Sequence, residues 1–136
     1  MENLKYIIIG QPVSFTKVNY ASNLGPNTTK ELRLIWEITL QGQHEGKAII
    51  TTELEVFFDF FFDETIRCRH PNHHMRVTPT ISDLIKFACE MATGIIWTDS
   101  RLIVKTHAEK YYSKEPRTEL TVIRIGSHGK NHQEYH

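Results

Sequence analysis

The sequence predicts a single α/β domain in which a mixed β-sheet packs against two helices. Alternating apolar residues along 48–62, the pattern of a half-buried strand, are the first indication. Two segments with helical apolar spacing, starting at residues 28 and 81, are the second. Short strand-like segments before and after them complete the order β-α-β-α-β-β, which one mixed sheet with two helices accommodates.

The first strand is predicted over Lys5 to Ile9. Residues 11–27 are rich in Pro, Ser, Asn and Gly, which indicates a loop. The first helix is predicted from Thr28 to Gln41, because Thr28 and Glu31 have the spacing of a capping box. The apolar positions expected on its buried face are Leu32, Ile35, Trp36 and Ile38.

The alternating segment is predicted to be a long central strand. One of its faces carries Leu54, Val56, Phe58, Phe60 and Phe62. The opposite face carries the acids Glu53, Glu55 and Asp59. Phe57 and Phe61 interrupt the polar face, so we expect a helix or a second subunit to cover part of it.

The second helix is predicted to begin near Ile81, because Thr80 can cap it and Asp83 completes a carboxylate variant of the capping box. Gly94 is expected to end this helix. The buried face is predicted to hold Ile81, Leu84, Ile85, Ala88 and Ala92. Beyond the turn, we expect Asp99 to face Asp83.

Two final strands are predicted over Leu102 to Tyr112 and Thr118 to Ile125, joined by a hairpin loop at 113–117. The domain is then expected to span 1–125, followed by a mobile tail over 126–136, which has no apolar pattern.

The chain has 136 residues and no net charge with its histidines neutral, which argues against nonspecific binding of polyanions as its main activity. Its first residues form too short an apolar run for a signal peptide or a membrane span, so we expect a cytoplasmic protein. Cys68 and Cys89 are predicted to be free thiols in a reducing compartment.

The segment from Thr65 to Ser82 contains three arginines and three histidines but no acid. Because arginine suits phosphate oxygens, contact with phosphates is the preferred interpretation of this loop. Its cysteine and histidines also suggest zinc, although their spacing fits no standard structural site. Whether they bind a metal stays open; they are Cys68, His70, His73 and His74.

A motif runs along the second helix in the order proline, x, hydrophobic, x, acid, two hydrophobics, lysine, from Pro79 to Lys86. A glycine, an apolar run and Asp99 follow it. With the segment 10–14 after the first strand and the segment 109–125 at the end, this order resembles the RusA family of Holliday-junction resolvases. The resemblance extends over residues 5 to 125 in one collinear order.

The resemblance implies a RusA-like fold and a magnesium-dependent endonuclease that nicks four-way DNA junctions as a homodimer in recombination and repair. Asp99 and Asp83 would hold Mg²⁺, and Lys86 would stabilise phosphate charge. It also implies a phage or prophage source. The residues expected to contact DNA are Arg67, Arg69, Arg76 and Lys17.

Thr80 and Ser82 stand where the family carries aspartates. Because a hydroxyl cannot supply the charge that Mg²⁺ requires of clustered carboxylates, we expect a homologue that binds branched DNA with cleavage weak or lost. Two alternatives stay open, an active endonuclease using Asp83 and Asp99 and a non-enzymatic protein-interaction module. The competing interpretation of this helix is an ordinary solvated face, on which Lys86 pairs with Glu90.

Overall fold

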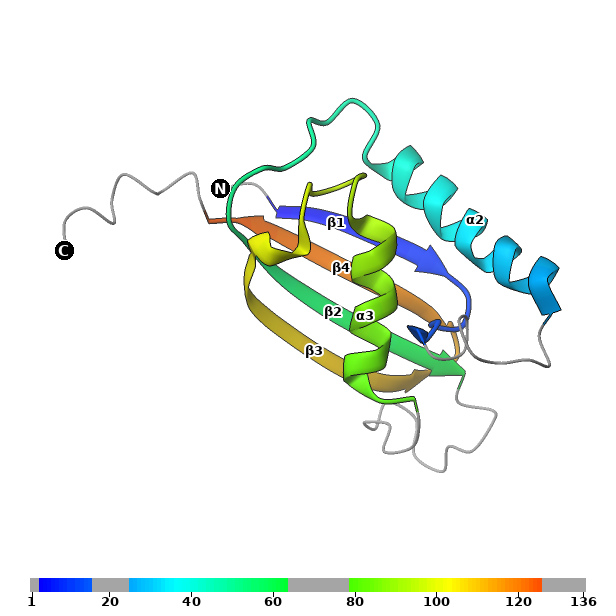
Figure 1. Cartoon of the computed structure of the whole chain (residues 1–136). Helices are drawn as coiled ribbons and strands as arrows, with labels where there is room; N and C mark the ends of the chain where they lie inside the picture. The colour runs from blue at the N-terminus through cyan, green and yellow to red at the C-terminus, as the bar shows by residue number, and fades with distance from the viewer. Residues whose placement is uncertain (1–2, 16–24, 64–78, 126–136) are drawn as a thin grey trace, which may run out of the picture.

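A computed structural model of the chain describes residues 3–15, 25–63 and 79–125. These residues form one four-stranded sheet with two helices packed on it (Figure 1). The α/β class and the order β-α-β-α-β-β are therefore confirmed. In this part of the chain, neither helix is long and apolar enough to cross a membrane. The tail predicted over 126–136 lies outside the described residues.

The sheet consists of β1 (Asn3–Ile9), β4 (Arg117–Arg124), β2 (Leu54–Asp63) and β3 (Ile103–Ser113), in that spatial order. β4 runs antiparallel to both of its neighbours, whereas β2 and β3 run parallel. The hairpin predicted at 113–117 is therefore wrong, because β2 lies between the two strands that it would join. The parallel pair instead requires a crossover connection, and a helix forms part of it.

β2 has the predicted alternation and lies in the interior of the sheet. It begins at Leu54 rather than at residue 48, because the preceding segment contributes only an isolated bridge between Ile50 and Trp97. The five predicted core residues are all buried: Leu54, Val56, Phe58, Phe60 and Phe62.

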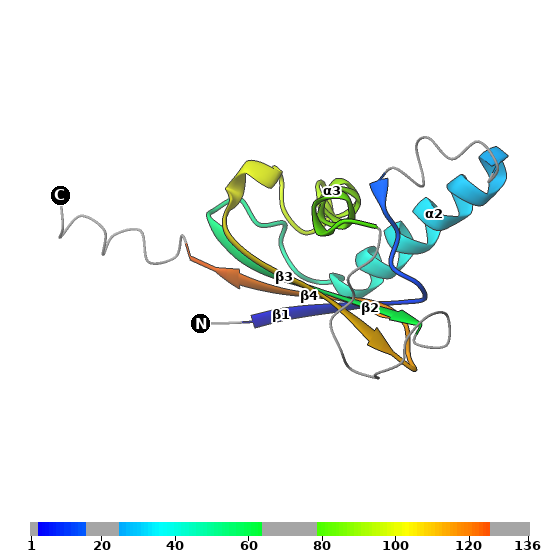
Figure 2. The ribbon, with the colours of Figure 1, turned by 90° about the horizontal axis from the view of Figure 1, so that it is seen from below.

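Both helices lie on the same face of the sheet (Figure 2). A helix over Phe57 and Phe61 was therefore the wrong expectation, since these rings lie on the face that carries no helix. Neighbouring strands shield them instead. The ring of Phe57 stacks on His107 with centroids 4.3 Å apart. Phe61 lies between the ring of Tyr111 at 4.9 Å and the guanidinium of Arg117 at 3.9 Å.

The first of these helices, α2 (Gly25–Gln43), begins three residues before Thr28, so the capping box predicted there is wrong. Proline is tolerated in the first turn because the amide hydrogens there have no partner within the helix. Among residues 30–43 of α2, Trp36 and Leu40 are buried.

The prediction was also wrong for Ile35 and Ile38 of α2, which are 52% and 59% exposed. Trp36 faces the core instead, where its ring meets the edge of Phe87 at 5.1 Å between centroids. Because Trp36 and Leu40 are four residues apart, burying this pair turns Ile38 away from the core.

The second helix, α3 (Ile81–Ala92), matches the prediction in its start and its cap. Thr80 is the cap residue. Gly94 follows the helix with a φ of 92°, a conformation that glycine adopts without a Cβ clash. Ile81 and Ile85 are only partly buried. The fully covered positions are Leu84, Phe87, Ala88 and Ala92.

A buried polar contact joins the end of α2 to β1. The hydroxyl of Tyr6 lies 2.6 Å from Nδ1 of His44, and His44 Nε2 lies 3.0 Å from the carbonyl oxygen of Ala48. A carbonyl oxygen only accepts, so Nε2 carries the hydrogen and Nδ1 accepts from Tyr6. This arrangement satisfies both nitrogens of a side chain that is 6% exposed.

Candidate functional site

The start of α3 is held by short polar contacts. The backbone N–H of Asp83 donates to Oγ1 of Thr80 at 3.2 Å, and that oxygen lies 3.3 Å from Oγ of Ser82. Lys110, on β3, donates from Nζ to the carbonyl oxygen of Pro79 at 2.8 Å. The hydroxyl of Thr80 therefore serves as the helix cap at the position where the family resemblance leads one to expect a metal-binding carboxylate.

Two lysines lie at this end of α3. Burial lowers the pKa of Lys110, because a desolvated ammonium is less favourable. Lys86 is exposed, and its ammonium lies 4.3 Å from the ring centroid of Phe15. Asp83 occupies the first turn, where the helix dipole favours a negative charge. The two lysines therefore bring positive charge to this end of α3, and the carboxylate of Asp83 partly offsets it.

Asp99 follows α3 and caps a short 3-10 turn, η1 (Ser100–Leu102). Its carboxylate accepts a hydrogen bond from the backbone N–H of Arg101 at 2.8 Å. The Arg101 guanidinium also donates to both carboxylate oxygens, at 2.8 to 3.2 Å. These bonds, the side-chain ones first, lower the pKa of Asp99. Its carboxylate is thus already engaged by a cation.

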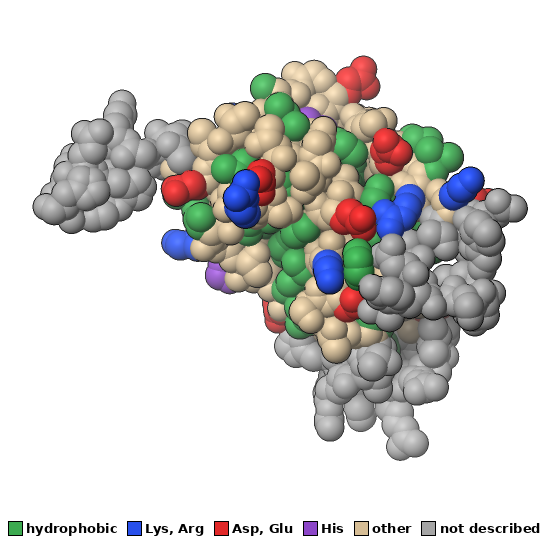
Figure 3. All heavy atoms as spheres, viewed as in Figure 1, with side chains coloured by type: hydrophobic (Ala, Val, Ile, Leu, Met, Phe, Trp, Pro, Cys, Tyr) green, Lys and Arg blue, Asp and Glu red, His purple; other side chains and the backbone are tan. Residues whose placement is uncertain are grey.

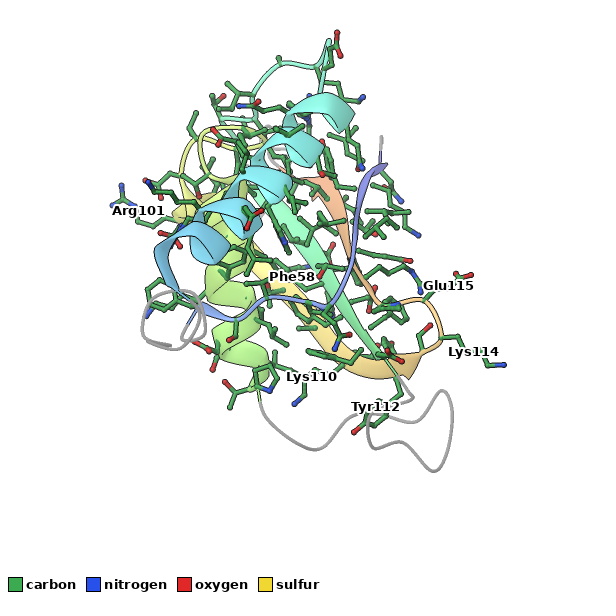
Figure 4. All side chains as sticks on the ribbon, turned by 90° about the vertical axis from the view of Figure 1, so that its right-hand side faces the viewer. Phe58, Arg101, Lys110, Tyr112, Lys114 and Glu115 are labelled. Carbon is green, nitrogen blue, oxygen red and sulfur yellow. The ribbon has the colours of Figure 1, made fainter. Side chains whose placement is uncertain are left out.

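Within one chain, Asp83 and Asp99 lie at opposite ends of α3. The hydroxyls of Thr93 and Ser100 are 2.9 Å apart, which attaches η1 to the C-terminal end of the helix. At about 1.5 Å per residue, the ten residues between Asp83 and Thr93 span about 15 Å. In Figure 4, Lys110 lies near the start of α3 and Arg101 lies near its other end. The expectation that Asp83 and Asp99 face each other is therefore wrong for a single chain.

Glu90 turns toward α2 rather than toward Lys86. Its carboxylate lies 3.3 Å from the guanidinium of Arg33, which also reaches the sulfur of Met91 at 3.8 Å. The predicted pairing of Lys86 with Glu90 is replaced by this contact between helices. Glu90 therefore helps to join α2 to α3.

The helix-bearing face shows basic and acidic side chains interspersed among apolar ones (Figure 3). Among the atoms described on this face, no continuous basic patch appears. The mixture of charges on this face is consistent with the zero net charge of the whole chain.

A comparison with known protein families matches residues 10–123 to the family described as Endodeoxyribonuclease RusA. The chain belongs to the RusA family. A search of curated proteins finds no significant match. The RusA match covers most of the chain and includes β2, α3, β3 and nearly all of β4.

RusA-family nucleases generally depend on a divalent metal. The donor groups at the start of α3 can therefore be compared with the ligands that such a metal requires. Mg²⁺ requires several oxygen ligands, and carboxylates supply the charge. Here two hydroxyls and Asp83 are present, and the hydroxyl of Thr80 is used by the helix cap. Among residues 3–15, 25–63 and 79–125, no three His, Cys, Asp or Glu side chains gather as a metal site. This donor set does not fit a Mg²⁺ site within one chain.

The predicted DNA contacts at Lys17, Arg67, Arg69 and Arg76 lie outside the described residues, as do Cys68 and the histidines at 70, 73 and 74. These assignments stay predictions. In the described part, Cys89 is a free thiol, and burial raises its pKa to about 11.

Sequence reasoning missed Lys110 as a residue of the helix start. Lys110 pairs in register with the buried Phe60, so it occupies a strand position whose side chain faces the helices. A lysine at an expected apolar position of an alternating strand was the available signal. Phe15, beneath the ammonium of Lys86, carried no comparable signal in the sequence.

Proposed function

We propose that this RusA-family chain is a homologue of the Holliday-junction resolvases that binds branched DNA during recombination and repair, with cleavage weak or lost. The observation that most directly supports weak or lost cleavage is the hydrogen bond from the Asp83 N–H to Thr80 Oγ1. The side chain at an expected metal-ligand position is a neutral hydroxyl that already caps α3. The fold and the family match support the DNA partner.

Divalent metal ions help hydrolyse phosphodiesters by stabilising charge on phosphate and by activating water. The described residues of one chain do not assemble the carboxylates that this chemistry needs. Asp99 is bound to Arg101 beyond the C-terminal end of α3, whereas Asp83 lies in the first turn of that helix. We therefore assign the chain the binding function first.

Phosphate binding at the start of α3 is assigned to groups that need no metal. Lys86 and Lys110 supply positive charge, and the N-terminus of α3 adds its dipole. Arg67, Arg69, Arg76 and Lys17 are proposed to extend this contact along the DNA backbone.

We also propose that the protein acts as a homodimer, because a four-way junction has approximate two-fold symmetry and a dimer matches it with two equivalent surfaces. A DNA partner in recombination and repair also implies a cytoplasmic location. Neither assignment requires a membrane partner.

The test compares binding and nicking of a synthetic four-way junction with those of a linear duplex of the same sequence. We expect tighter binding to the junction, a binding constant that falls with salt, and little nicking in Mg²⁺ or Mn²⁺. Robust nicking that is abolished by Asp99→Asn would show an active enzyme and overturn the loss of cleavage. Equal binding to both DNAs would overturn junction recognition, and no salt-dependent binding would favour a protein-interaction module.

A further inference from the structure

The ion pair between Asp99 and Arg101 leaves part of the guanidinium open. The carboxylate accepts from Nε and Nη2 of Arg101 at 2.8 to 3.2 Å. Among residues 3–15, 25–63 and 79–125, no acceptor contacts Nη1, and the arginine side chain is 92% exposed. Because a guanidinium carries its N–H donors in a planar fork, the Nη1 hydrogens of Arg101 can meet a ligand while Asp99 holds the other edge.

The backbone that carries this pair is fixed on both sides. On its N-terminal side, the N–H of Thr98 donates to the carbonyl oxygen of Ile50 at 3.1 Å. On its C-terminal side, the hydroxyl of Ser100 lies 2.9 Å from that of Thr93. The indole Nε1 of Trp97, which is fully buried, donates to the same Thr93 hydroxyl at 3.1 Å. The carboxylate of the pair is therefore presented from a fixed position.

Arg101 occupies the oxygens that a metal ion at Asp99 would need. Both carboxylate oxygens accept from the guanidinium, and Oδ1 also accepts from the backbone N–H of Arg101 at 2.8 Å. A second cation at these oxygens would be repelled by the first. Arg101 therefore competes directly with a metal ion for Asp99.

We propose that Arg101, oriented by Asp99, binds a phosphate of the DNA backbone and serves as the cation that a divalent metal supplies in RusA nucleases. This deepens the proposed function, since it rests on DNA being the partner. In either arrangement a carboxylate of the protein holds a cation, and the cation faces the phosphate. A guanidinium can bind the phosphate but does not activate a water molecule as a metal ion does, which agrees with weak or lost cleavage.

The position of Arg101 suits a duplex arm that lies along α3. In Figure 4, Arg101 projects outward on the side of the sheet that carries the helices. α3 has 12 residues and is therefore about 18 Å long. This length corresponds to about five base pairs at about 3.4 Å each. DNA that contacts Lys86 near the start of α3 can thus also reach Arg101 beyond its end.

Asp99 acts in this proposal as a positioning residue that does not touch DNA. Its negative charge repels phosphate, but salt at about 0.15 M screens such a repulsion over about 8 Å. The bonds to the carboxylate hold a long side chain that would otherwise lose its rotational freedom on binding DNA. Removing the acid should therefore weaken DNA binding, whereas charge alone predicts that it would strengthen binding.

The first test measures binding of a fluorescent four-way junction by anisotropy, with a chelator present and at several salt concentrations. Arg101→Ala should weaken binding about tenfold and reduce the slope of log affinity against log salt by about 0.9. Arg101→Lys should keep the slope but lose part of the affinity, because it lacks the fork. Lys114→Ala removes an exposed charge at the turn after β3 and is the matched control. Equal losses in Arg101→Ala and Lys114→Ala would overturn the contact.

Asp99→Asn tests the sign of the acid's effect. Asparagine can still accept from the backbone N–H of residue 101, so η1 should persist, and melting temperatures check the fold. Binding at about 0.15 M salt should weaken roughly threefold, although the protein becomes more positive. In the Arg101→Ala background the same substitution should weaken binding no further, because the acid acts through the guanidinium. Tighter binding by Asp99→Asn alone would overturn the positioning role.

The second test asks whether Arg101 excludes a metal ion from Asp99. Mn²⁺ is added without DNA, and paramagnetic broadening of the backbone amide NMR signals of residues 98–102 is followed. Broadening should begin at a several-fold lower Mn²⁺ concentration in Arg101→Ala than in the wild type or Lys114→Ala. Adding Asp99→Asn to Arg101→Ala should remove that gain. Equal broadening in the wild type and Arg101→Ala would show that the guanidinium does not stand in for a metal.

A linear duplex of the same sequence is measured with the same samples, so the two proposals fail separately. Junction-selective binding that is insensitive to Arg101 and Asp99 overturns the phosphate contact and leaves the proposed function standing. Equal binding to both DNAs, with the expected pattern among the variants, supports the contact and overturns junction recognition. The absence of binding to either DNA overturns both.

Discussion

Arg101 holds the carboxylate of Asp99 through its backbone N–H and its guanidinium, at distances of 2.8 to 3.2 Å. The contact lies at the C-terminal end of α3, away from the capped helix start. It ties the remaining family-matched acid to a cation of its own chain. Removing Arg101 is therefore the direct way to release Asp99.

Arg101→Ala should raise the pKa of Asp99 toward the ordinary value of about 3.9, because the hydrogen bonds that favour the carboxylate are lost. In the wild type, the bonds to ionised Asp99 stabilise the fold fully when the pH is above the ordinary pKa of an aspartate. This stabilisation is lost as the pH falls through the lowered pKa of Asp99. Carboxyl carbon NMR over a pH series measures the midpoint. Arg101→Lys should give a smaller rise, since it keeps the charge without the fork, and an unchanged midpoint in Arg101→Ala would contradict the contact.

Thr80→Asp with Ser82→Asp should increase affinity for Mn²⁺, because it places two carboxylates where the helix dipole tolerates negative charge. Aspartate is also a good cap residue, so α3 should persist. Calorimetry of metal binding, beside junction nicking, is the measurement. The control is Thr80→Asn with Ser82→Asn, which keeps capping ability without the charge. Equal affinities in the two double variants would show that these positions are not a potential metal site.

Replacing Arg67, Arg69 and Arg76 by alanine should weaken DNA binding irrespective of sequence. Each lost phosphate contact should also reduce the slope of log affinity against log salt by about 0.9 for duplex arms. Fluorescence anisotropy at several salt concentrations measures both effects. The charge-matched control replaces the exposed Lys30, Lys47 and Lys114. Equal losses in the two variants would mean that net charge, and not this loop, sets the affinity.

Asp59→Asn should stabilise the protein at pH 7. Asp59 lies opposite Glu109 on one neighbouring strand and opposite Glu119 on the other. Burial first, and then these two carboxylates, raise its pKa, although Lys5 opposes the shift. A raised pKa means that the wild type loses stability as pH rises through it, so the advantage of Asn should vanish below about pH 3.9.

Urea denaturation of wild type and Asp59→Asn from pH 3 to 7 measures that difference. Glu115→Gln removes an exposed charge at the turn between β3 and β4 and serves as the control. A gain in Asp59→Asn that is the same at every pH would contradict the charge argument.

Tyr6→Phe should cost about 1 to 3 kcal/mol of unfolding free energy, because Nδ1 of the buried His44 would lose its donor. Chemical denaturation monitors the change. Tyr112→Phe, at a partly exposed position, removes a hydroxyl without touching this contact and should have a much smaller effect. Equal effects of the two substitutions would rule out a special cost of the buried nitrogen.

The sequence predicted α3 and β2 well because their signals are local. A cap hydroxyl at Thr80 and a glycine at 94 mark two ends of a helix segment, and alternation from Leu54 to Phe62 marks a half-buried strand. Each pattern depends only on residues within the element.

The wrong predictions concern features that depend on contacts between residues far apart in the sequence. α2 has apolar side chains on more than one face, and contact with Phe87 of α3 selects Trp36 over Ile38. Likewise, β4 follows β3 in sequence but pairs with β1 and β2. No pattern within β4 itself predicts these partners. The separation of Asp83 and Asp99 also depends on a contact outside the helix, because the segment after α3 is long enough to run back along it and the contact between Thr93 and Ser100 instead holds η1 at the C-terminal end.

The position of β4 affects how the chain folds during synthesis. β4 is the last strand in the described part of the chain, yet it supplies the partner of the first one there, from Asn3 opposite Ile123 to Ile9 opposite Arg117. Until residues 117–124 have left the ribosome, β1 has no neighbouring strand and β2 lacks one of its two. Such long-range pairing slows folding, because the chain loses the entropy of a long loop before the contacts between the strands can stabilise it. Nascent chains ending before Arg117 should therefore remain protease-sensitive.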